Sequence, residues 1–156
     1  MDKNAVVEAL LDSLKAELNS AVAASHDAAD YAVDEEARAE SQWDTQGLEA
    51  SYLAAGQASQ ARQWAEAIES LERSRNELLE ARTQIALGAF ARCEIKGAEE
   101  HFFVAPVGGG QVLSLDDATI TVLTPRSPLA ALMWGKQSGE TFVPADGGGA
   151  KILDIQ

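Results

Sequence analysis

Residues 4–28 read NAVVEALLDSLKAELNSAVAASHDA, and this stretch decides the fold of the N-terminal half. Its apolar and small side chains recur at heptad spacing, with two further residues that broaden the stripe. These residues are Val7, Leu10, Leu11, Leu14, Leu18, Ala21 and Val22. Side chains three, four and seven residues apart share one face of an α-helix. The stretch therefore predicts an amphipathic helix with a narrow apolar face.

A second stretch, residues 48–87, has the same kind of spacing and contains no proline. Its apolar positions are Ala54, Ala61, Trp64, Ile68, Leu71, Leu78 and Ile85. Two helices of this length are too long to enclose a compact core, so we predict an antiparallel coiled-coil hairpin over residues 1–87. Alanine replaces leucine toward the turn, which favours close approach of the two helices there.

From Gly88 onward, short runs of β-favouring residues alternate with glycines. We expect strands at residues 89–95, 100–105, 119–123, 140–144 and 151–155. Ser127 and Pro128 are typical of the start of a helix, and Gly135 is typical of its end. The fold class is therefore predicted to be α+β, with a small antiparallel sheet domain and one short helix in residues 88–156.

The charge of the chain limits its partners. Its 156 residues include 12 Lys and Arg against 25 Asp and Glu, a net charge of −13. This charge opposes independent binding to the phosphates of DNA or RNA, so a basic protein or a metal ion is the expected partner. No apolar run is long enough to span a membrane, and the single cysteine, Cys93, excludes an internal disulfide and a thiolate-rich zinc site. We expect a cytoplasmic protein.

The predicted turn of the hairpin, residues 27–49, concentrates acidic side chains around a single basic residue, Arg38. The acids are Asp27, Asp30, Asp34, Glu35, Glu36, Glu40, Asp44 and Glu49. One interpretation is an ordinary solvated loop. The other is that carboxylates at the end of a rigid arm serve as hard oxygen ligands for Mg²⁺ at the active site of another protein. Trp43 lies in the same turn and either anchors it or contacts that partner.

Other motifs favour structural roles. The two glycine triplets lack the Lys-Ser/Thr that follows a phosphate-binding loop, so they predict hairpin turns. His26 and His101 are far apart and lack metal-ligand spacing. Ser127 lacks the glycines of a nucleophile elbow and is explained as a helix cap. Trp134, after the short helix, is expected to pack in the core or against another part of the chain.

Residues 127–140, SPLAALMWGKQSGE, resemble without a gap the signature S-P-(I/L)-(G/A)-x-A-L-(L/I)-G-K-x-x-G-(D/E) of the Gre family of bacterial transcription elongation factors. Residues 141–155 resemble the closing hairpin of the same family, with Gly147 and Gly148 at its turn. The resemblance implies an FKBP-like C-terminal domain that docks on the rim of the secondary channel of RNA polymerase. It implies that Ser127 and Pro128 belong to this docking surface.

The resemblance also implies that the coiled coil carries an acidic tip to the active site of the polymerase, where the tip helps to hydrolyse backtracked RNA. By position, the tip acids are Asp34, Glu35, Glu36, Glu40 and Asp44. Glu36 and Glu40 are the candidates to share the Mg²⁺ of the polymerase. A factor of this kind is an accessory to an enzyme, not an enzyme itself, and it needs no cofactor of its own.

The tip departs from the family pattern D-L-x-E-N-A-E-Y, since residues 34–44 read DEEARAESQWD. Stimulation of RNA cleavage is the leading interpretation, and inhibition or regulation of transcription from the same channel is the alternative. A third interpretation, prolyl isomerisation by the FKBP-like domain, requires an aromatic-lined pocket. The available residues, Phe90, Phe102, Phe103 and Phe142, fall at positions expected in the core.

Overall fold

The computed structural model describes residues 1–38, 46–145 and 147–156. Two compact units are present, and each is described by itself. The sheet unit consists of Met1–Ser13 and Glu69–Gln156, and the arm unit is Leu14–Ile68. Two helices run through both units, α1 (Lys3–Arg38) and α2 (Gln46–Leu79). None of the described helices is long and apolar enough to cross a membrane.

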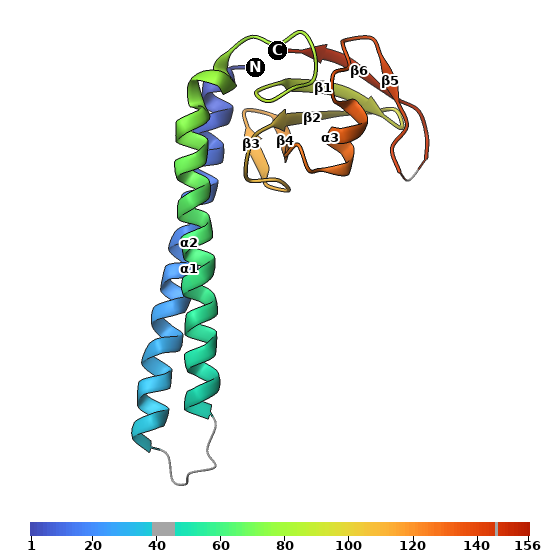
Figure 1. The fold of residues 1–156 in the computed structure, drawn as a ribbon. Coiled ribbons are helices and arrows are strands. Elements are labelled where there is room, and N and C mark those ends of the chain that lie inside the picture. Colours follow the sequence, from blue (N-terminus) through green and yellow to red (C-terminus); the bar gives the residue numbers. More distant parts are fainter. Residues whose placement is uncertain (39–45, 146) are drawn as a thin grey trace. The chain divides into compact units, whose positions relative to one another are not determined.

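The arm unit is the antiparallel helical hairpin expected from the heptad pattern (Figure 1). Beyond Leu14, its buried residues are small, as the alanine-rich stripe predicts, and they include Ala21, Ala28, Ala32 and Ala50. The Ser25 hydroxyl donates a hydrogen bond of 3.2 Å to the carbonyl oxygen of Ala54 on the facing helix. Small side chains allow this contact, because a side-chain donor reaches the opposite backbone only where two helices lie close together.

We expect Ala28→Leu to destabilise the hairpin by about 1–3 kcal/mol, because the larger side chain overpacks a closely spaced interface. Ala28 is buried, whereas Ala23 on the same helix is exposed. Ala23→Leu is therefore the matched control and should leave stability within about 0.5 kcal/mol of the original chain. Thermal unfolding followed by far-ultraviolet circular dichroism measures both variants. Equal melting temperatures for the two would contradict close alanine packing.

The sheet unit contains a six-stranded sheet with the order β3-β4-β2-β1-β6-β5. The strands are β1 (Phe90–Ile95), β2 (Ala98–Val104), β3 (Val112–Leu115), β4 (Ala118–Leu123), β5 (Thr141–Phe142) and β6 (Ala150–Ile155). A short helix, α3 (Pro128–Met133), lies between β4 and β5 in the chain. The α+β class and the order of helical hairpin, sheet and short helix are confirmed.

Two details of the sequence prediction are corrected by the structure. The sheet is mixed, because β2 pairs with β4 in parallel, with His101 opposite Ile120. The cause is the unforeseen strand β3, which occupies the edge and forms a hairpin with β4, so that β4 lies beside β2 and runs in its direction. In addition, α2 ends at Leu79, and Ile85 belongs to the core of the sheet instead of the coil.

Both faces of the sheet contain buried side chains. One face packs under α3 in a core that includes Phe102, Leu123 and Met133. On the other face, Phe103 and Ile120 are fully buried, although they are absent from that core. The Ser13 hydroxyl at the end of the first α1 segment of the sheet unit donates a hydrogen bond of 2.8 Å to Gln111 Oε1, just before β3.

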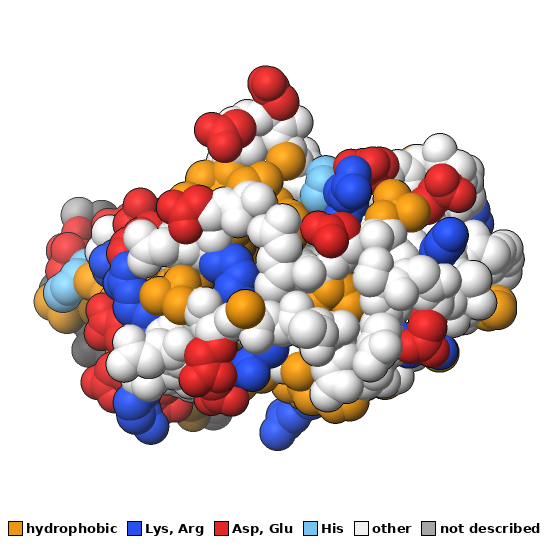
Figure 2. Space-filling view, turned by 90° about the horizontal axis from the view of Figure 1, so that it is seen from above, with side chains coloured by type: hydrophobic (Ala, Val, Ile, Leu, Met, Phe, Trp, Pro, Cys, Tyr) orange, Lys and Arg blue, Asp and Glu red, His pale blue; other side chains and the backbone are white. Residues whose placement is uncertain are grey.

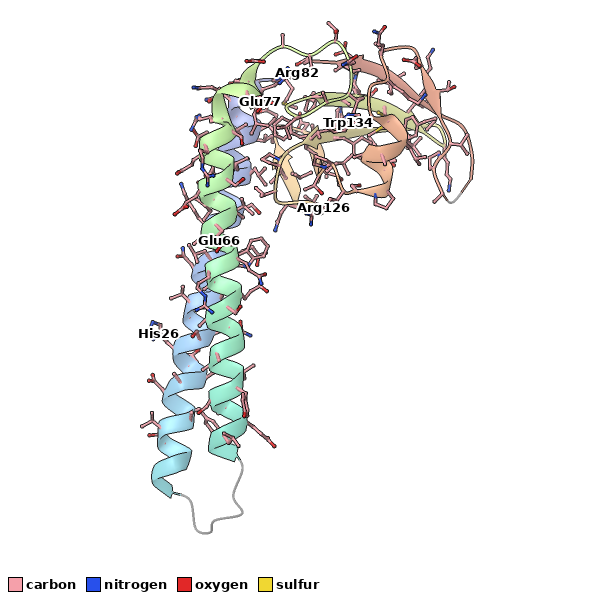
Figure 3. All side chains as sticks on the ribbon, in the orientation of Figure 1. His26, Glu66, Glu77, Arg82, Arg126 and Trp134 are labelled. Carbon is pink, nitrogen blue, oxygen red and sulfur yellow. The ribbon has the colours of Figure 1, made fainter. Side chains whose placement is uncertain are left out.

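The end of α2 packs closely against the loop that leads into β1. Gly88 has a φ of 81°, and a Cβ there would lie 2.9 Å from the Cα of Leu78, so only glycine fits without a shift of the backbone. Arg82 Nε donates to the carbonyl of Leu87 at 2.9 Å, and the guanidinium lies 3.2 Å from a Glu80 carboxylate oxygen. Arg82 and Glu77 are labelled together at this end of α2 in Figure 3.

The Lys3 side chain is buried against the same loop. Although lysine is rarely buried, only 9% of Lys3 is exposed, and its ammonium donates to the carbonyls of Glu80, Gly88 and Gln156. The hydrogen bond to Gly88 measures 2.8 Å. Burial lowers the pKa of Lys3 from its ordinary value, and the nearby charge of Arg82 lowers it further, while the carboxylate of Glu80 opposes the shift. One side chain thus ties the first turn of α1 to three separate segments.

Candidate docking surface

The helix α3 begins at Pro128 because Ser127 caps it. The Ser127 backbone is extended, and its hydroxyl accepts a hydrogen bond of 3.5 Å from the backbone N–H of Ala130. Pro128 occupies the first turn, where its missing N–H costs nothing and its fixed φ already suits a helix. The predicted role of Ser127 as a helix cap is confirmed.

The end of α3 is tied to the segment after α2. The backbone N–H of Trp134 donates to Ala130 at 2.8 Å, and Gly135 follows with a φ of 75°. The N–H of Gly135 then donates to the carbonyl of Ile85, and the N–H of Ile85 donates to the carbonyl of Lys136, both at 2.8 Å. This reciprocal pair holds α3 in a fixed position on the sheet unit.

One face of α3 is buried and the other is exposed, although the side chains on both faces are apolar. Ala130 and Met133, three residues apart, point into the core. Pro128, Ala131 and Leu132 are exposed, although every residue of α3 is apolar. A short surface helix normally carries polar residues on its outer face. The outer face of α3 is therefore an apolar surface without a partner in the described part of the chain.

Trp134 at the end of α3 extends this surface. The exposed fractions are 40% for Leu132 and 46% for Trp134. We call Pro128, Ala131, Leu132 and Trp134 the docking face. The prediction that Trp134 packs in the core or against another part of the chain is wrong, because the chain turns away at Gly135 and leaves nearly half of the indole exposed. Figure 2 shows other apolar side chains exposed among charged ones.

Two hollows adjoin the loop that leads into α3. The first, of about 350 Å³, is lined by Ser127, Pro128, Leu129, Leu132, Pro144 and Ala145. The second, of about 590 Å³, is lined by Leu87, Pro106, Thr124, Pro125 and Arg126. Neither hollow contains an aromatic residue in its lining. The four phenylalanines considered for a prolyl isomerase pocket are all buried in the sheet unit, so they do not form such a pocket.

The charges around the docking face are few. Arg126 is exposed and has no hydrogen bond or ion pair with any described residue; Figure 3 labels it in the loop before α3. Glu140 stabilises the loop after α3. It accepts a 2.7 Å hydrogen bond from the backbone N–H of Gln137 and lies 3.8 Å from Lys136 Nζ. Arg126 is therefore available for a carboxylate of a partner.

The structure describes the predicted acids only in part. Asp34 is exposed on α1. Glu35 and Glu36 lie in the last turn of α1, but their side chains are outside the described part, and Glu40 and Asp44 lie outside the described residues altogether, as does Trp43. Their roles at the tip stay predictions. Among the described residues, no group of three or more His, Cys, Asp or Glu side chains could hold a metal ion.

The remaining candidates have structural roles. His26 is exposed, and His101 stacks on Phe90 with a ring separation of 5.9 Å. Cys93 is fully buried. Burial, assisted by the negative charge of Glu100, raises the pKa of the Cys93 thiol to about 12, which keeps it protonated and unreactive near neutral pH. None of these groups points to a catalytic site.

The sequence prediction did not single out Leu132, and it named Trp134 only as a packing residue. A signal for Leu132 was present, because Ala130 and Met133 are three residues apart and share the inner face, which turns the intervening Leu132 outward. The fold is that of an α+β chain with a helical hairpin, a sheet and a short apolar helix that is partly exposed.

No family model matches the chain, and no curated protein sequence matches it. Among solved structures, it is similar to the GreA factor homolog 1 (Gfh1) protein of Thermus thermophilus, with 16% identity over 94% of each chain and a TM-score of 0.36. The Gfh1 of Thermus aquaticus has 18% identity over 96% of this chain and 95% of its own, with a TM-score of 0.35.

A third similar structure is the prokaryotic transcription elongation factor GreA/GreB from Nitrosomonas europaea. It has 11% identity and a TM-score of 0.34, and the match covers 53% of this chain and 79% of that one.

Proposed function

We propose that this chain is a Gre-type transcription elongation factor that binds RNA polymerase through the docking face and inserts the acidic end of its arm into the secondary channel. One observation carries the proposal. The segment that resembles the Gre signature, residues 127–140, forms a capped helix whose outer face is apolar, exposed and fixed to the core. Leu132 and Trp134 add exposed apolar surface where a short surface helix used only for folding would carry polar side chains.

The physical basis of docking is the burial of a preformed apolar surface. Leu132 and Trp134 on the docking face lose water on contact, and large apolar and aromatic side chains of this kind carry most of the energy of an interface. Since α3 is already held by the hydrogen bonds between Gly135, Ile85 and Lys136, little conformational entropy is lost on binding. Arg126 beside the face would add an ion pair with an acidic group of the polymerase.

In this proposal the arm supplies carboxylates to chemistry that belongs to the polymerase. Carboxylate oxygens are ligands that Mg²⁺ prefers, and the candidates are Glu36 and Glu40, with Asp34, Glu35 and Asp44 beside them. The acids would help to hold a Mg²⁺ ion and its water at the polymerase site, so that backtracked RNA is hydrolysed there. The chain acts as an accessory factor with no reaction of its own.

The alternative is a secondary-channel inhibitor or regulator without cleavage activity. The departure of residues 34–44 from the family tip pattern favours this alternative, because the spacing of the acids differs. Docking on the polymerase is common to both functions.

A transcript cleavage assay on stalled, backtracked elongation complexes tests the proposal. Purified chain should bind core RNA polymerase and increase the release of short RNA 3′ fragments in a Mg²⁺-dependent manner. Binding without cleavage at saturating concentration would reject the elongation-factor function and leave the inhibitor. Absence of binding would reject both.

A further inference from the structure

The arm unit exposes an unusual set of large side chains. Both tyrosines of the chain belong to it, and both are exposed, Tyr31 to 51% and Tyr52 to 72%. Leu53 is exposed to 56%, and Val33 and Leu48 are exposed as well. A solvated coiled coil normally presents charged and polar residues at such positions. Tyrosine exposed together with aliphatic side chains is typical of a protein interface.

Part of this set surrounds a hollow that both helices form. It has a volume of about 370 Å³ and is lined by Tyr31 from α1 and by Glu49, Ala50 and Leu53 from α2. Ala50 is buried and forms part of the helix interface, whereas the Tyr31 and Leu53 side chains are more than half exposed. We call these four residues the arm hollow. Its volume lies in the range of small recognition pockets and suits one or two side chains of a partner.

The surroundings of the arm hollow are acidic. Asp27 and Asp34 lie about one helical turn before and after Tyr31, and both are exposed. Glu49 lies one turn before Leu53 and lines the hollow itself. In the sequence, Arg38 is the only lysine or arginine between Lys15 and Arg62. Among the described side chains of this region, none is a cation that would neutralise the acids.

The acidic surroundings and the exposed tyrosine and leucine together indicate what kind of partner the arm hollow would bind. Acidic surroundings attract Lys or Arg, and tyrosine attracts a cation to the face of its ring. Leu53 and Ala50 contribute apolar surface for aliphatic groups, including the methylene stem of lysine. Phosphate backbones are repelled by the carboxylates, and a second copy of this chain, with a net charge of −13, is repelled as well.

We propose that the arm hollow binds a basic protein segment in which Lys or Arg alternates with aliphatic side chains. The proposal differs from that for the docking face, because it concerns the other unit and depends on charge complementarity. If the chain is a polymerase factor, this segment belongs to RNA polymerase, and only this last step rests on the proposed function.

The test uses the full chain labelled with ¹⁵N and a short synthetic peptide of alternating Lys and Leu. Amide shifts on titration should concentrate in residues 27–34 and 47–53, and they should weaken with added salt because the contact is between charged groups. A peptide of alternating Glu and Leu should cause none. We expect Tyr31→Ser combined with Leu53→Ser to weaken binding about tenfold or more, which corresponds to about 1.4 kcal/mol. Val22→Ser, at an exposed position outside the hollow, is the matched control.

Several outcomes would overturn the proposal. These are shifts outside the two segments, unchanged affinity in the double variant, equal binding of the Glu-Leu peptide, or concentration-dependent shifts without peptide that reveal self-association. Circular dichroism verifies that the variants stay helical, and Tyr31→Phe should retain most of the affinity because its ring remains.

A second measurement separates this proposal from the proposed function. A photoreactive amino acid at position 53 of the full chain is mixed with core RNA polymerase, and the cross-linked polymerase segment is identified. A segment rich in Lys and Arg supports both proposals. A polymerase segment without basic residues overturns the inference. If the Lys-Leu peptide binds at the hollow but the polymerase does not bind the chain, the proposed function fails and the inference stands.

Discussion

Lys3→Met is expected to lower the free energy of unfolding by about 2–4 kcal/mol near neutral pH, since each buried carbonyl left without a donor costs about 1–3 kcal/mol. Methionine keeps the length of the side chain but removes the ammonium that bonds three segments. The carbonyl of Gln156 keeps a second donor, the N–H of Phe90 at 3.0 Å. The carbonyls of Glu80 and Gly88 therefore account for most of the loss.

The same substitution should change the dependence of stability on pH. The pKa of Lys3 is lowered in the folded protein from its ordinary value of 10.5, chiefly by burial. Between the lowered pKa and 10.5, the unfolded chain binds more protons than the folded one, so the free energy of unfolding rises with pH. This rise comes from relief of the cost of burying a charge, and it ends once the unfolded lysine has also lost its proton. Lys3→Met should abolish the Lys3 contribution to this rise.

Urea unfolding monitored by tryptophan fluorescence, repeated from neutral to alkaline pH, measures both effects. Lys15→Met is the matched control, because Lys15 lies on the same helix but is exposed. It should leave the stability within about 0.5 kcal/mol of the original chain. A Lys3→Met variant as stable as Lys15→Met at neutral pH would show that the three carbonyls do not need the ammonium.

Leu132→Glu should weaken binding to RNA polymerase about thirtyfold or more, if the docking face is the contact surface. A central apolar side chain of an interface is worth about 2 kcal/mol or more, and each 1.4 kcal/mol corresponds to about a factor of ten in affinity. A buried carboxylate without a partner adds to the loss. Pro128→Ala should also weaken binding, because it alters the first turn of α3 and removes apolar surface. Competition binding with labelled original chain provides the measurement.

Val22→Glu is the matched control, since Val22 is a helical valine with the same exposed fraction as Leu132, 40%. It should retain affinity. Circular dichroism and thermal unfolding verify that Leu132→Glu is folded, which is expected because the side chain lies outside the core. Equal losses in the two variants would show that added negative charge, and not the docking face, determines binding.

Replacement of Glu36 and Glu40 together by alanine should reduce activity and not affinity, whereas Leu132→Glu should reduce affinity. Affinity for the polymerase should change little, because the docking face is untouched. Activity per bound complex, whether cleavage or inhibition, should fall by about a hundredfold if positioned ligands contribute about 3 kcal/mol. If this variant loses binding as severely as Leu132→Glu and keeps its activity per bound complex, the acids belong to the docking surface and the division of roles is wrong.

Much of the fold could be predicted from the sequence because the relevant signals are local. The heptad spacing in residues 4–28 depends only on helix periodicity, and it correctly predicts a helical hairpin with alanine at the buried positions toward the turn, Ala21 and Ala28. Ser127 and Pro128 begin α3 through contacts within one turn of helix, so the cap was predictable as well. The division into independently folding parts at residues 87 and 88 stays a prediction.

The structure adds features that depend on contacts between distant segments. Strand β3 was missed because its four residues, Val112–Leu115, carry little local signal, and its pairing with β4 is what makes the β2–β4 pair parallel. Burial of Lys3 was not predicted, because the carbonyls that it binds belong to residues 77, 85 and 153 positions away.

For the candidate sites, the sequence by itself determined which residues carry the resemblance and where the acids concentrate, since both are patterns along the chain. Only the tertiary structure decided which side chains of α3 remain outside the core. Ala130 and Met133 are used to pack on the sheet, and Leu132 and Trp134 are left exposed. The physical reason is that burial is a property of the assembled layers: a leucine is equally apolar on either face of a helix, and the sheet beneath it determines which face is covered.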